Sequence, residues 1–306
     1  MIYTLTTNPA IDLNICSKAI APGVVNRTFS PIYTPNGKGV NVSFVLKHFG
    51  IDSKILGFFG GFTGRYIVEE SEKKGVEVVP VWVDDITRIN ILLNDGKEEF
   101  KFINEGALVT EAQEQEMLTL IESLEDMTCL SVNGSLSKGM DDEFYVKVME
   151  ICKKKGVKVI LDISSPKLKE LLEYGPYLIK PNDEEIKSVF GIIMRDEKDI
   201  IDVLHMLHEK GAQNILLTLG DKGSYFFNGK EIFCAGTQPV KLLSSACAGD
   251  SALAAFLSLW LEDHSRVEEA LKRSAATGAN VAESSAIGDL KKVSQYAENI
   301  RVKKVG

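Results

Sequence analysis

The feature that most constrains the fold of this chain is a regular alternation of short apolar runs and amphipathic segments. The apolar runs lie at residues 129–133, 157–162, 177–179 and 214–218, and the segments between them repeat their apolar residues at helical spacing. Strands buried on both faces are typical of parallel sheets, whose connections pass through helices. The alternation therefore predicts an α/β fold with a central, mostly parallel sheet and helices on both faces.

The first third of the chain interrupts this pattern. A first buried strand is expected at residues 2–6, and later an Asp-Gly pair at residues 95–96 supplies the positive φ angles of a tight hairpin turn. The segments at about 11–33 and 87–105 lie within the α/β pattern rather than before it. We therefore expect one domain comprising the whole chain, with a small β-sheet lid inserted in it from these two segments.

The last third is expected to add one hairpin and then only helices. Asn228-Gly229 marks the hairpin turn, and the helices are expected to start near residue 249 and to cover residues 267–285 and 290–297. The hairpin is therefore expected to form the far edge of the main sheet.

Composition argues against several classes of partner. The formal net charge is −8, whereas binding to nucleic acid requires a basic face. The five cysteines are scattered and form no C-x-x-C pair, so neither a disulfide framework nor a zinc site is expected, and a cytoplasmic location fits best. No basic leader or long apolar run is visible at the N-terminus, which argues against a membrane partner.

Polar or glycine-rich stretches follow the expected strands at many points along the chain. In open parallel sheets, ligands bind beyond the carboxyl ends of the strands. A binding site is therefore expected at this edge, where these stretches converge: residues 8–12, 57–64, 133–135, 162–164, 180–182 and 218–220.

Residues 244–251 combine small side chains with the start of an amphipathic helix. The N–H groups of Ala248, Gly249 and Asp250 would begin that helix without intrahelical partners. Such a helix end carries partial positive charge and attracts phosphate oxygens. For Asp250 two interpretations are open: a structural N-cap, or a carboxylate placed beside a bound anion.

Two glycine-rich turns have compositions that suit ligand binding. Gly37 precedes Lys38 at a helix start, so the backbone could approach a ligand while Lys38 and Asn41 supply polar contacts; an ordinary tight turn explains the residues as well. The loop at residues 218–223 suits a nucleotide phosphate, but such loops also occur without ligands. Neither a Walker A sequence nor a G-x-G-x-x-G is present, so a P-loop or Rossmann dehydrogenase has little support.

Charged and amide side chains elsewhere also have two interpretations. Arg27 and Arg88 are candidate phosphate ligands because guanidinium forks match phosphate geometry, or they are solvated surface residues. Asn182 and Glu185 form a capping-box pattern, or they order water around Mg²⁺. His205 and a second histidine share a helix face, but nothing nearby completes a metal set.

Taken together, these residues resemble the PfkB, or ribokinase-like, family of carbohydrate kinases, and most closely its phosphosugar branch of 1-phosphofructokinases and tagatose-6-phosphate kinases. Each motif is weak alone, but their order along the whole chain is specific. The motifs are Asn8-Pro9-Ala10-x-Asp12, Gly37-Lys38-Gly39-x-Asn41, Thr87-Arg88-x-Asn90, Gly134-Ser135-Leu136, Lys180-Pro181-Asn182-x-x-Glu185, Leu219-Gly220-x-x-Gly223 and Ala248-Gly249-Asp250-Ser251.

The resemblance implies a ribokinase-like fold and a role for each candidate residue. Asp250 would be the catalytic base, with Ala248 and Gly249 completing an anion hole. The sugar and its phosphate would be bound by Asp12, Arg27, Gly37, Lys38, Asn41, Arg88, Ser135 and Asp162. The nucleotide would be bound by Asn182, Thr218, Gly220, Gly223 and Asn280, with Glu185 serving the metal through water.

The resemblance also implies the reaction: ATP- and Mg²⁺-dependent phosphorylation of a phosphorylated ketohexose, with fructose 1-phosphate converted to fructose 1,6-bisphosphate as the first expectation. A tagatose-6-phosphate kinase and a non-catalytic sugar-phosphate or nucleotide sensor are the alternatives. A homodimer through the lid is a possible assembly. The chain departs from the family where glycine is usual, at Asn36 and at Cys247, and Ser137 replaces a usual proline.

Overall fold

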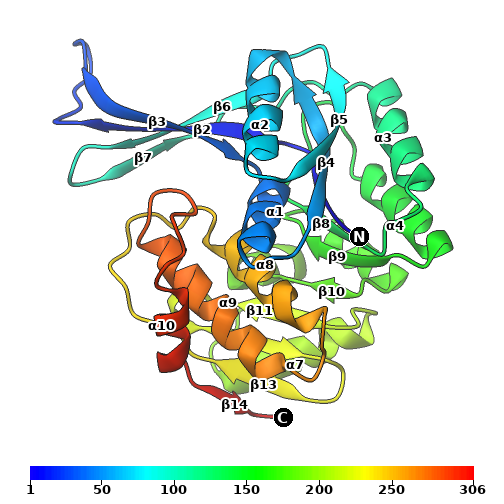
Figure 1. The fold of residues 1–306 in the computed structure, drawn as a ribbon. Coiled ribbons are helices and arrows are strands. Elements are labelled where there is room, and N and C mark those ends of the chain that lie inside the picture. Colours follow the sequence, from blue (N-terminus) through cyan, green and yellow to red (C-terminus); the bar gives the residue numbers. More distant parts are fainter.

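The computed structural model describes residues 1–306, and its main element is a ten-stranded sheet (Figure 1). The strands lie side by side in the order β14 (Val302–Lys304), β13 (Ile232–Ala235), β12 (Ser224–Phe227), β11 (Ile215–Thr218), β10 (Leu178–Ile179), β9 (Lys158–Asp162), β8 (Cys129–Asn133), β1 (Ile2–Thr6), β4 (Ser53–Gly60) and β5 (Glu77–Val83).

All strands from β11 to β5 in this order run parallel to their neighbours. Apart from the edge strand β5, which exposes Glu77 and Trp82, each is a short and mostly buried segment, as the sequence predicts. Because the strands are parallel, their carboxyl ends meet at one edge of the sheet, and the loops that follow them are brought together there.

Helices cover both faces of the main sheet (Figure 1). One face packs against α3 (Glu111–Ser123), α4 (Glu143–Lys155), α5 (Leu168–Leu171) and α7 (Glu197–Glu209). The other packs against α1 (Lys38–His48), α2 (Gly61–Lys73), α8 (Ala248–Trp260), α9 (Val267–Ala282) and α10 (Val293–Asn299). None of the helices is both long enough and apolar enough to cross a membrane.

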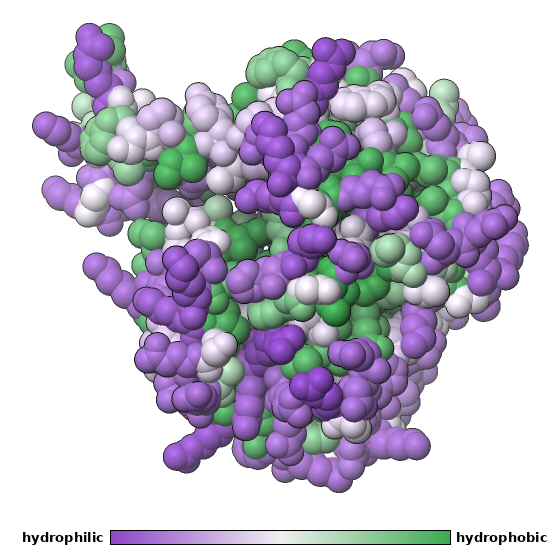
Figure 2. Space-filling view, in the orientation of Figure 1, coloured by the Kyte–Doolittle hydropathy of each residue, from purple (hydrophilic) through white to green (hydrophobic).

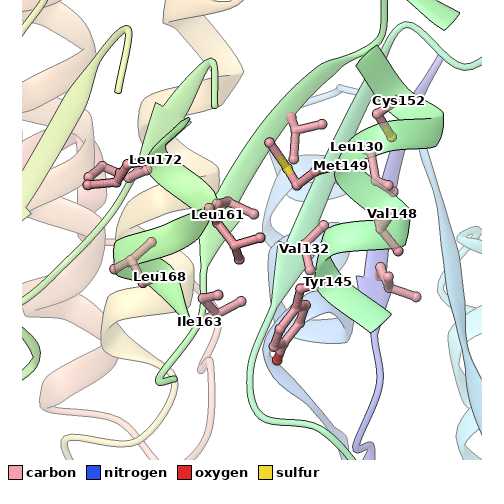
Figure 3. Close-up of a cluster of buried hydrophobic side chains, with 14 of the residues drawn as sticks. Leu130, Val132, Tyr145, Val148, Met149, Cys152, Leu161, Ile163, Leu168 and Leu172 are labelled. Atoms are coloured by element: carbon pink, nitrogen blue, oxygen red, sulfur yellow. The ribbon is translucent and has the colours of Figure 1, made fainter. Parts of the chain in front are cut away.

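Alternating residues of one strand supply the two cores. On β9, Leu161 belongs to the core under α4 and α5, whereas Ile160 belongs to the core under α8 and α9. Figure 3 shows the first of these cores, in which Val148 and Met149 of α4 face the buried residues of β8 and β9. The α/β sandwich predicted from the apolar runs is confirmed.

The far edge of the main sheet differs from the expectation. The β12–β13 hairpin is present and antiparallel, but β14 pairs with β13 and takes the outermost place. This strand has only three residues, Val302–Lys304, two of them lysines, so its apolar pattern is too short to predict a strand. Residues 183–190 form a short turn, α6 (Asp183–Glu185), continued by a π-helix over Ile186–Phe190.

The two early segments form a separate four-stranded sheet, here called the small sheet, as expected. Its order is β3 (Thr28–Asn36), β2 (Ala10–Ser17), β6 (Arg88–Asn94) and β7 (Glu99–Phe102), with β2 and β6 parallel and the outer pairs antiparallel. It projects from the body of the molecule (Figure 1), and Figure 2 shows a hollow beneath its base. The small sheet and the carboxyl edge of the main sheet therefore enclose a space between them.

Candidate active site

A cleft of about 510 Å³ opens at the carboxyl edge of the main sheet, where the small sheet begins. Most of its lining is polar, which suits a ligand with many hydroxyl and phosphate oxygens. Its walls come from the ends of β1, β8, β10 and β11, the bases of β2, β3 and β6, and the starts of α1 and α8. The edge predicted from the polar stretches is thus the edge that is hollowed.

The first turn of α8 faces this cleft with its N–H groups unoccupied by any capping side chain. Cys247 precedes the helix in a left-handed conformation (φ 63°), and no side chain caps the helix start. The first intrahelical bond is donated by the N–H of Ser251 to the carbonyl of Cys247 (2.9 Å), so the N–H groups before it have no helical partner. This end of α8 can therefore accept phosphate oxygens.

Asp250 lies in the first turn of α8 and does not cap it, so the interpretation as an N-cap is wrong. Its side chain lines the cleft although only 7% of the residue is exposed. Its Oδ2 accepts a hydrogen bond from Asn41 Nδ2 (2.9 Å). Burial raises the pKa of Asp250, and the positive charge of Lys38 opposes that rise. The carboxylate is thus held in one orientation at the cleft wall.

Behind this wall, a fully buried carboxylate joins two lysines. Asp162 Oδ1 lies 3.2 Å from Lys38 Nζ and 3.1 Å from Lys180 Nζ. Burial alone would raise the pKa of Asp162, but the two ammonium groups outweigh it and hold this pKa below its usual range. Asp162 itself does not line the cleft; the two lysines do, so its contact with a ligand would be indirect.

Lys180 lines the cleft, although it was not among the site residues expected from the sequence. Only 4% of it is exposed, yet it lines the cleft, and its Nζ lies 3.6 Å from the position that a Cβ on Gly249 would occupy. Its ammonium group therefore stands beside the open end of α8. The available signal was its place directly after β10, at the carboxyl edge of the sheet.

A chain of amide groups links Asp12 to Asp250. Asp12 Oδ1 accepts from Asn90 Nδ2 (2.9 Å), and its Oδ2 accepts from Asn36 Nδ2. Asn36 Oδ1 in turn accepts from Asn41 Nδ2 (2.7 Å), which also donates to Asp250. Burial raises the pKa of Asp12, and these amide donors oppose it. Asn36 and Asn90 were not among the expected site residues, although Asn90 lies within a quoted motif and Asn36 directly precedes one.

Gly37 is required by the packing at the start of α1. Its φ is 139°, and a Cβ added there would lie 2.7 Å from Thr6 Oγ1. The turn can therefore press closely against the end of β1, which places Lys38 and Asn41 in the cleft.

The two candidate arginines are placed differently. Arg88 is half-buried, lines the cleft and donates to the carbonyls of Asn104 and Asn8 (both 3.1 Å), while its Nε has no partner. Arg27 lies on the exposed loop between β2 and β3 and does not line the cleft. The structure therefore does not bring Arg27 together with the other candidates within one chain.

Asn182 and Glu185 form the capping box that was one of their two interpretations. Glu185 N donates to Asn182 Oδ1 (2.8 Å), and Asn182 N donates to Glu185 Oε2 (3.0 Å). Ser164 Oγ donates to Glu185 Oε1 (2.6 Å), and Asn182 and Ser164 line the cleft. Oxygen donors of this kind suit Mg²⁺, which keeps several of its waters, but no cluster of three acidic, His or Cys side chains offers a direct cage.

The remaining expected residues divide into those in the cleft and those outside it. Thr218 and Ser135 line it. Gly220 has open space where a Cβ would stand, whereas a Cβ on Gly223 would meet the Ala235 carbonyl at 2.1 Å, so Gly223 is explained by packing. Asn280 is buried and accepts from the N–H of Lys292 (3.2 Å), so its side chain supports the loop after α9 rather than the cleft.

The chain is similar to known carbohydrate kinases over nearly its whole length. The model of the pfkB family of carbohydrate kinases matches residues 5–292. The chain is 44% identical over 302 residues to a D-tagatose-1-phosphate kinase of Klebsiella oxytoca and 31% identical over 302 residues to a 1-phosphofructokinase of Bacillus subtilis, each alignment covering 99% of both proteins. It superposes on phosphofructokinase-2 from Escherichia coli, solved in complex with substrates and products, with a TM-score of 0.89 at 26% identity, covering 97% of this chain and 99% of that one.

Proposed function

The chain belongs to the pfkB family of carbohydrate kinases, and from this premise we propose that it transfers the γ-phosphoryl group of ATP to the free primary hydroxyl of a ketohexose 1-phosphate. One observation carries the proposal: a buried carboxylate, Asp250, stands in the cleft beside an uncapped helix end and two lysines. Phosphoryl transfer needs little more than alignment, a proton acceptor and positive charge around the moving group.

We propose D-tagatose 1-phosphate as the preferred sugar and fructose 1-phosphate as the second. The two differ only in configuration at C4, and both names occur among the full-length relatives, the tagatose name at the higher identity. This ranking departs from the first expectation, which placed fructose 1-phosphate ahead. Tagatose 6-phosphate, whose free primary hydroxyl is at C1, is the alternative.

In the proposed reaction Asp250 accepts the proton of the sugar's C6 hydroxyl as the oxygen attacks the γ-phosphorus. The new O–P bond forms as the bond to the β-phosphate oxygen breaks, and ADP leaves with the electron pair of that bond. The hydrogen bond from Asn41 holds the carboxylate toward the hydroxyl. Base assistance of this kind contributes about 10²–10⁴-fold to the rate.

The positive charge comes from the start of α8 and from the two lysines on Asp162. The N–H groups of Ala248 and Gly249 would bind the transferring phosphoryl oxygens, with Lys180 beside them. Mg²⁺ bound to ATP would add charge to the β- and γ-phosphates; Asn182 and Glu185 would hold its waters. Thr218 and the open side of Gly220 would lie along the nucleotide.

Arg88 would bind the phosphate already on the sugar. Each terminal guanidinium nitrogen donates one hydrogen bond to a backbone carbonyl, and the Nε–H has no partner. The small sheet would act as a lid that excludes water from the bound sugar. Asp12, which is buried beside Asn36 and Asn90 of the cleft lining, would bind a sugar hydroxyl, and Ser135 would lie along the same cleft.

We also propose that two copies pair through the small sheet. The small sheet and the loops beside its strands expose large apolar side chains that a monomer would leave in water: Val24, Val25, Phe29, Ile32, Tyr33, Phe102 and Ile103. Arg27 lies in the exposed loop that joins β2 to β3 of this sheet. A pair of this kind would place Arg27 near the partner rather than in its own cleft.

The test is ADP release by the purified protein with ATP, Mg²⁺ and a panel of hexose phosphates. We expect the highest kcat/KM with D-tagatose 1-phosphate, a lower value with fructose 1-phosphate and little turnover of tagatose 6-phosphate. Highest turnover of tagatose 6-phosphate would reverse the proposed orientation of the sugar. Binding of these sugars without ADP release would overturn the kinase assignment in favour of a sensor.

A further inference from the structure

Two side chains from distant parts of the chain meet at the sugar half of the cleft. Asn36 ends β3 and Cys247 precedes α8, and Cys247 Sγ lies 4.0 Å from Asn36 Oδ1. Both residues line the cleft. They are also the two positions at which the sequence shows side chains in place of glycines.

Cys247 adopts a backbone conformation that favours glycine. Its φ is 63°, and only Ser30, Ala286 and Leu290 share a positive φ among the non-glycine residues. A side chain in this region costs stability, so its presence beside a cleft points to a function. Burial raises the pKa of the Cys247 thiol, and the thiol donates a weak hydrogen bond to Asn36 Oδ1 (4.0 Å).

The orientation of the Asn36 amide is fixed by its neighbours. Its Oδ1 accepts from the backbone N–H of Gly37 (2.6 Å), which is an obligatory donor, so Nδ2 must face the Asp12 carboxylate. One N–H of Nδ2 is used there, and the structure gives the other no partner. The Asp12 carboxylate has lone pairs beyond those used by Asn36 and Asn90.

A single sugar hydroxyl can form a hydrogen bond with each of these two groups. It would donate to Asp12 and accept from the second N–H of Asn36. The position of Asp250 indicates which sugar hydroxyl this would be. Asn41 donates to both Asn36 and Asp250, so Asn36 and Asp12 lie close to the C6 hydroxyl that receives the phosphoryl group. In a furanose ring C5 carries the ring oxygen, so the nearest hydroxyl to C6 is the one at C4.

Resting on the proposed function, we propose that Asn36 and Cys247 together select ketohexose 1-phosphates by their configuration at C4. The hydroxyl of the preferred epimer pairs with Asp12 and Asn36. The other epimer leaves these buried polar groups unpaired and directs its hydroxyl elsewhere, while Cys247 fixes the amide and fills the adjacent space. Sites that hydrogen-bond a particular hydroxyl discriminate strongly because the unpaired groups are penalised.

The experiment measures kcat/KM for D-tagatose 1-phosphate and fructose 1-phosphate in the same preparations. The variants are Asn36→Gly, Cys247→Gly, the double variant, and Cys247→Ala, which keeps the strained backbone but removes the sulfur. Ala286→Gly is the matched control, because it relieves a positive φ outside the cleft. The melting temperature of every variant is measured alongside.

We expect Asn36→Gly to move the ratio of the two kcat/KM values toward one by about tenfold or more. Cys247→Gly and Cys247→Ala should move it in the same direction by less, and the double variant should match Asn36→Gly because the two residues act through one contact. Cys247→Gly should keep or raise the melting temperature, and Ala286→Gly should leave the ratio unchanged.

Three outcomes would overturn the inference. The first is a wild-type ratio already near one. The second is an Asn36→Gly variant that loses activity equally with both sugars, which would indicate a structural role. The third is a ratio that changes as much in Ala286→Gly as in Cys247→Gly. A wild-type protein inactive with both sugars would instead overturn the proposed function, and this inference with it.

Discussion

Two helices begin at the same cleft with an acidic residue in the third position, and they use it in opposite ways. In α6 that residue is Glu185, which bonds back to the N–H of Asn182 while Asn182 caps the helix in return. In α8 it is Asp250, which makes no bond to its own helix start and instead accepts from Asn41 on α1. One helix start is closed by its own side chains, and the other is open.

The difference lies in the residue before each helix. Asn182 carries a side-chain oxygen that can accept from the first turn, whereas Cys247 carries only sulfur and stands in a left-handed conformation. An uncapped buried helix end leaves donors without partners, a cost that a folded protein accepts where a ligand supplies the partners. The comparison therefore separates a structural helix start from one prepared for an anion.

The largest expected effect is on catalysis and comes from Asp250→Asn. Removing the proton acceptor while keeping its shape should lower kcat by about 10²–10⁴-fold. Because burial raises the pKa of Asp250, the charged form is disfavoured in the fold, so the neutral amide should not lower the melting temperature. Steady-state kinetics measures the loss of kcat, and thermal unfolding of the same preparation measures the melting temperature.

Glu185→Gln is the matched control at the closed helix start. The amide keeps an oxygen for the N–H of Asn182, so we expect a smaller loss of kcat and a higher KM for Mg²⁺–ATP. Equal losses of kcat in Asp250→Asn and Glu185→Gln would contradict the proposal that the two helix starts have different roles.

The second effect concerns the charges behind the open helix end. Asp162→Asn should lower the free energy of unfolding by about 3–5 kcal/mol, because it leaves the ammonium of Lys180 buried without a counter-charge. Asp52→Asn removes a carboxylate from an exposed ion pair with Lys47 and should leave stability nearly unchanged. Denaturant unfolding compares the two; similar small losses would show that Lys180 is not electrostatically dependent on Asp162.

Much of the fold was predictable because it is specified by local patterns. The apolar runs gave the parallel strands, and the Asp-Gly turn gave the β6–β7 hairpin of the small sheet. Strand β14 was missed because three residues with two lysines carry no apolar period. The open start of α8 was visible in the sequence as small residues before an amphipathic helix, but whether Asp250 capped it was decided only by the distant Asn41.

The parts of the cleft that were not predicted depend on long-range contacts. Lys180 lines the cleft because the sheet order places β10 beside β9, which brings its ammonium group to Asp162. Asn36 can donate to Asp12 because β3 pairs with β2 and places Asn36 opposite Ala10, two residues before Asp12. Conversely, Asn280 was expected from resemblance alone, and its side chain is occupied by Lys292. Spacing along the chain contains none of this information.

A smaller effect should follow from opening the closed helix start. Asn182→Ala removes the oxygen that accepts from Glu185 N and should cost about 0.5–2 kcal/mol of stability. Cys247→Ala at the other helix start removes no capping bond and should cost less, since no side chain caps α8. The two variants are compared by urea unfolding under identical conditions. A greater loss in Cys247→Ala would mean that the sulfur, and not an absent cap, determines the stability of that end.

The smallest effect is a pH dependence that has opposite signs for the two buried carboxylates. The raised pKa of Asp250 contributes stability that is present below the unfolded value of about 3.9 and is lost as the pH rises through the folded pKa. The lowered pKa of Asp162 contributes stability that is present above that value and is lost as the pH falls through the folded pKa. The stability advantage of Asp250→Asn over wild type should therefore grow as the pH rises above about 4 and then level off. Urea unfolding of both proteins at a series of pH values measures it, and an advantage that shrinks with rising pH would mean that the charged form of Asp250 is the one the fold prefers.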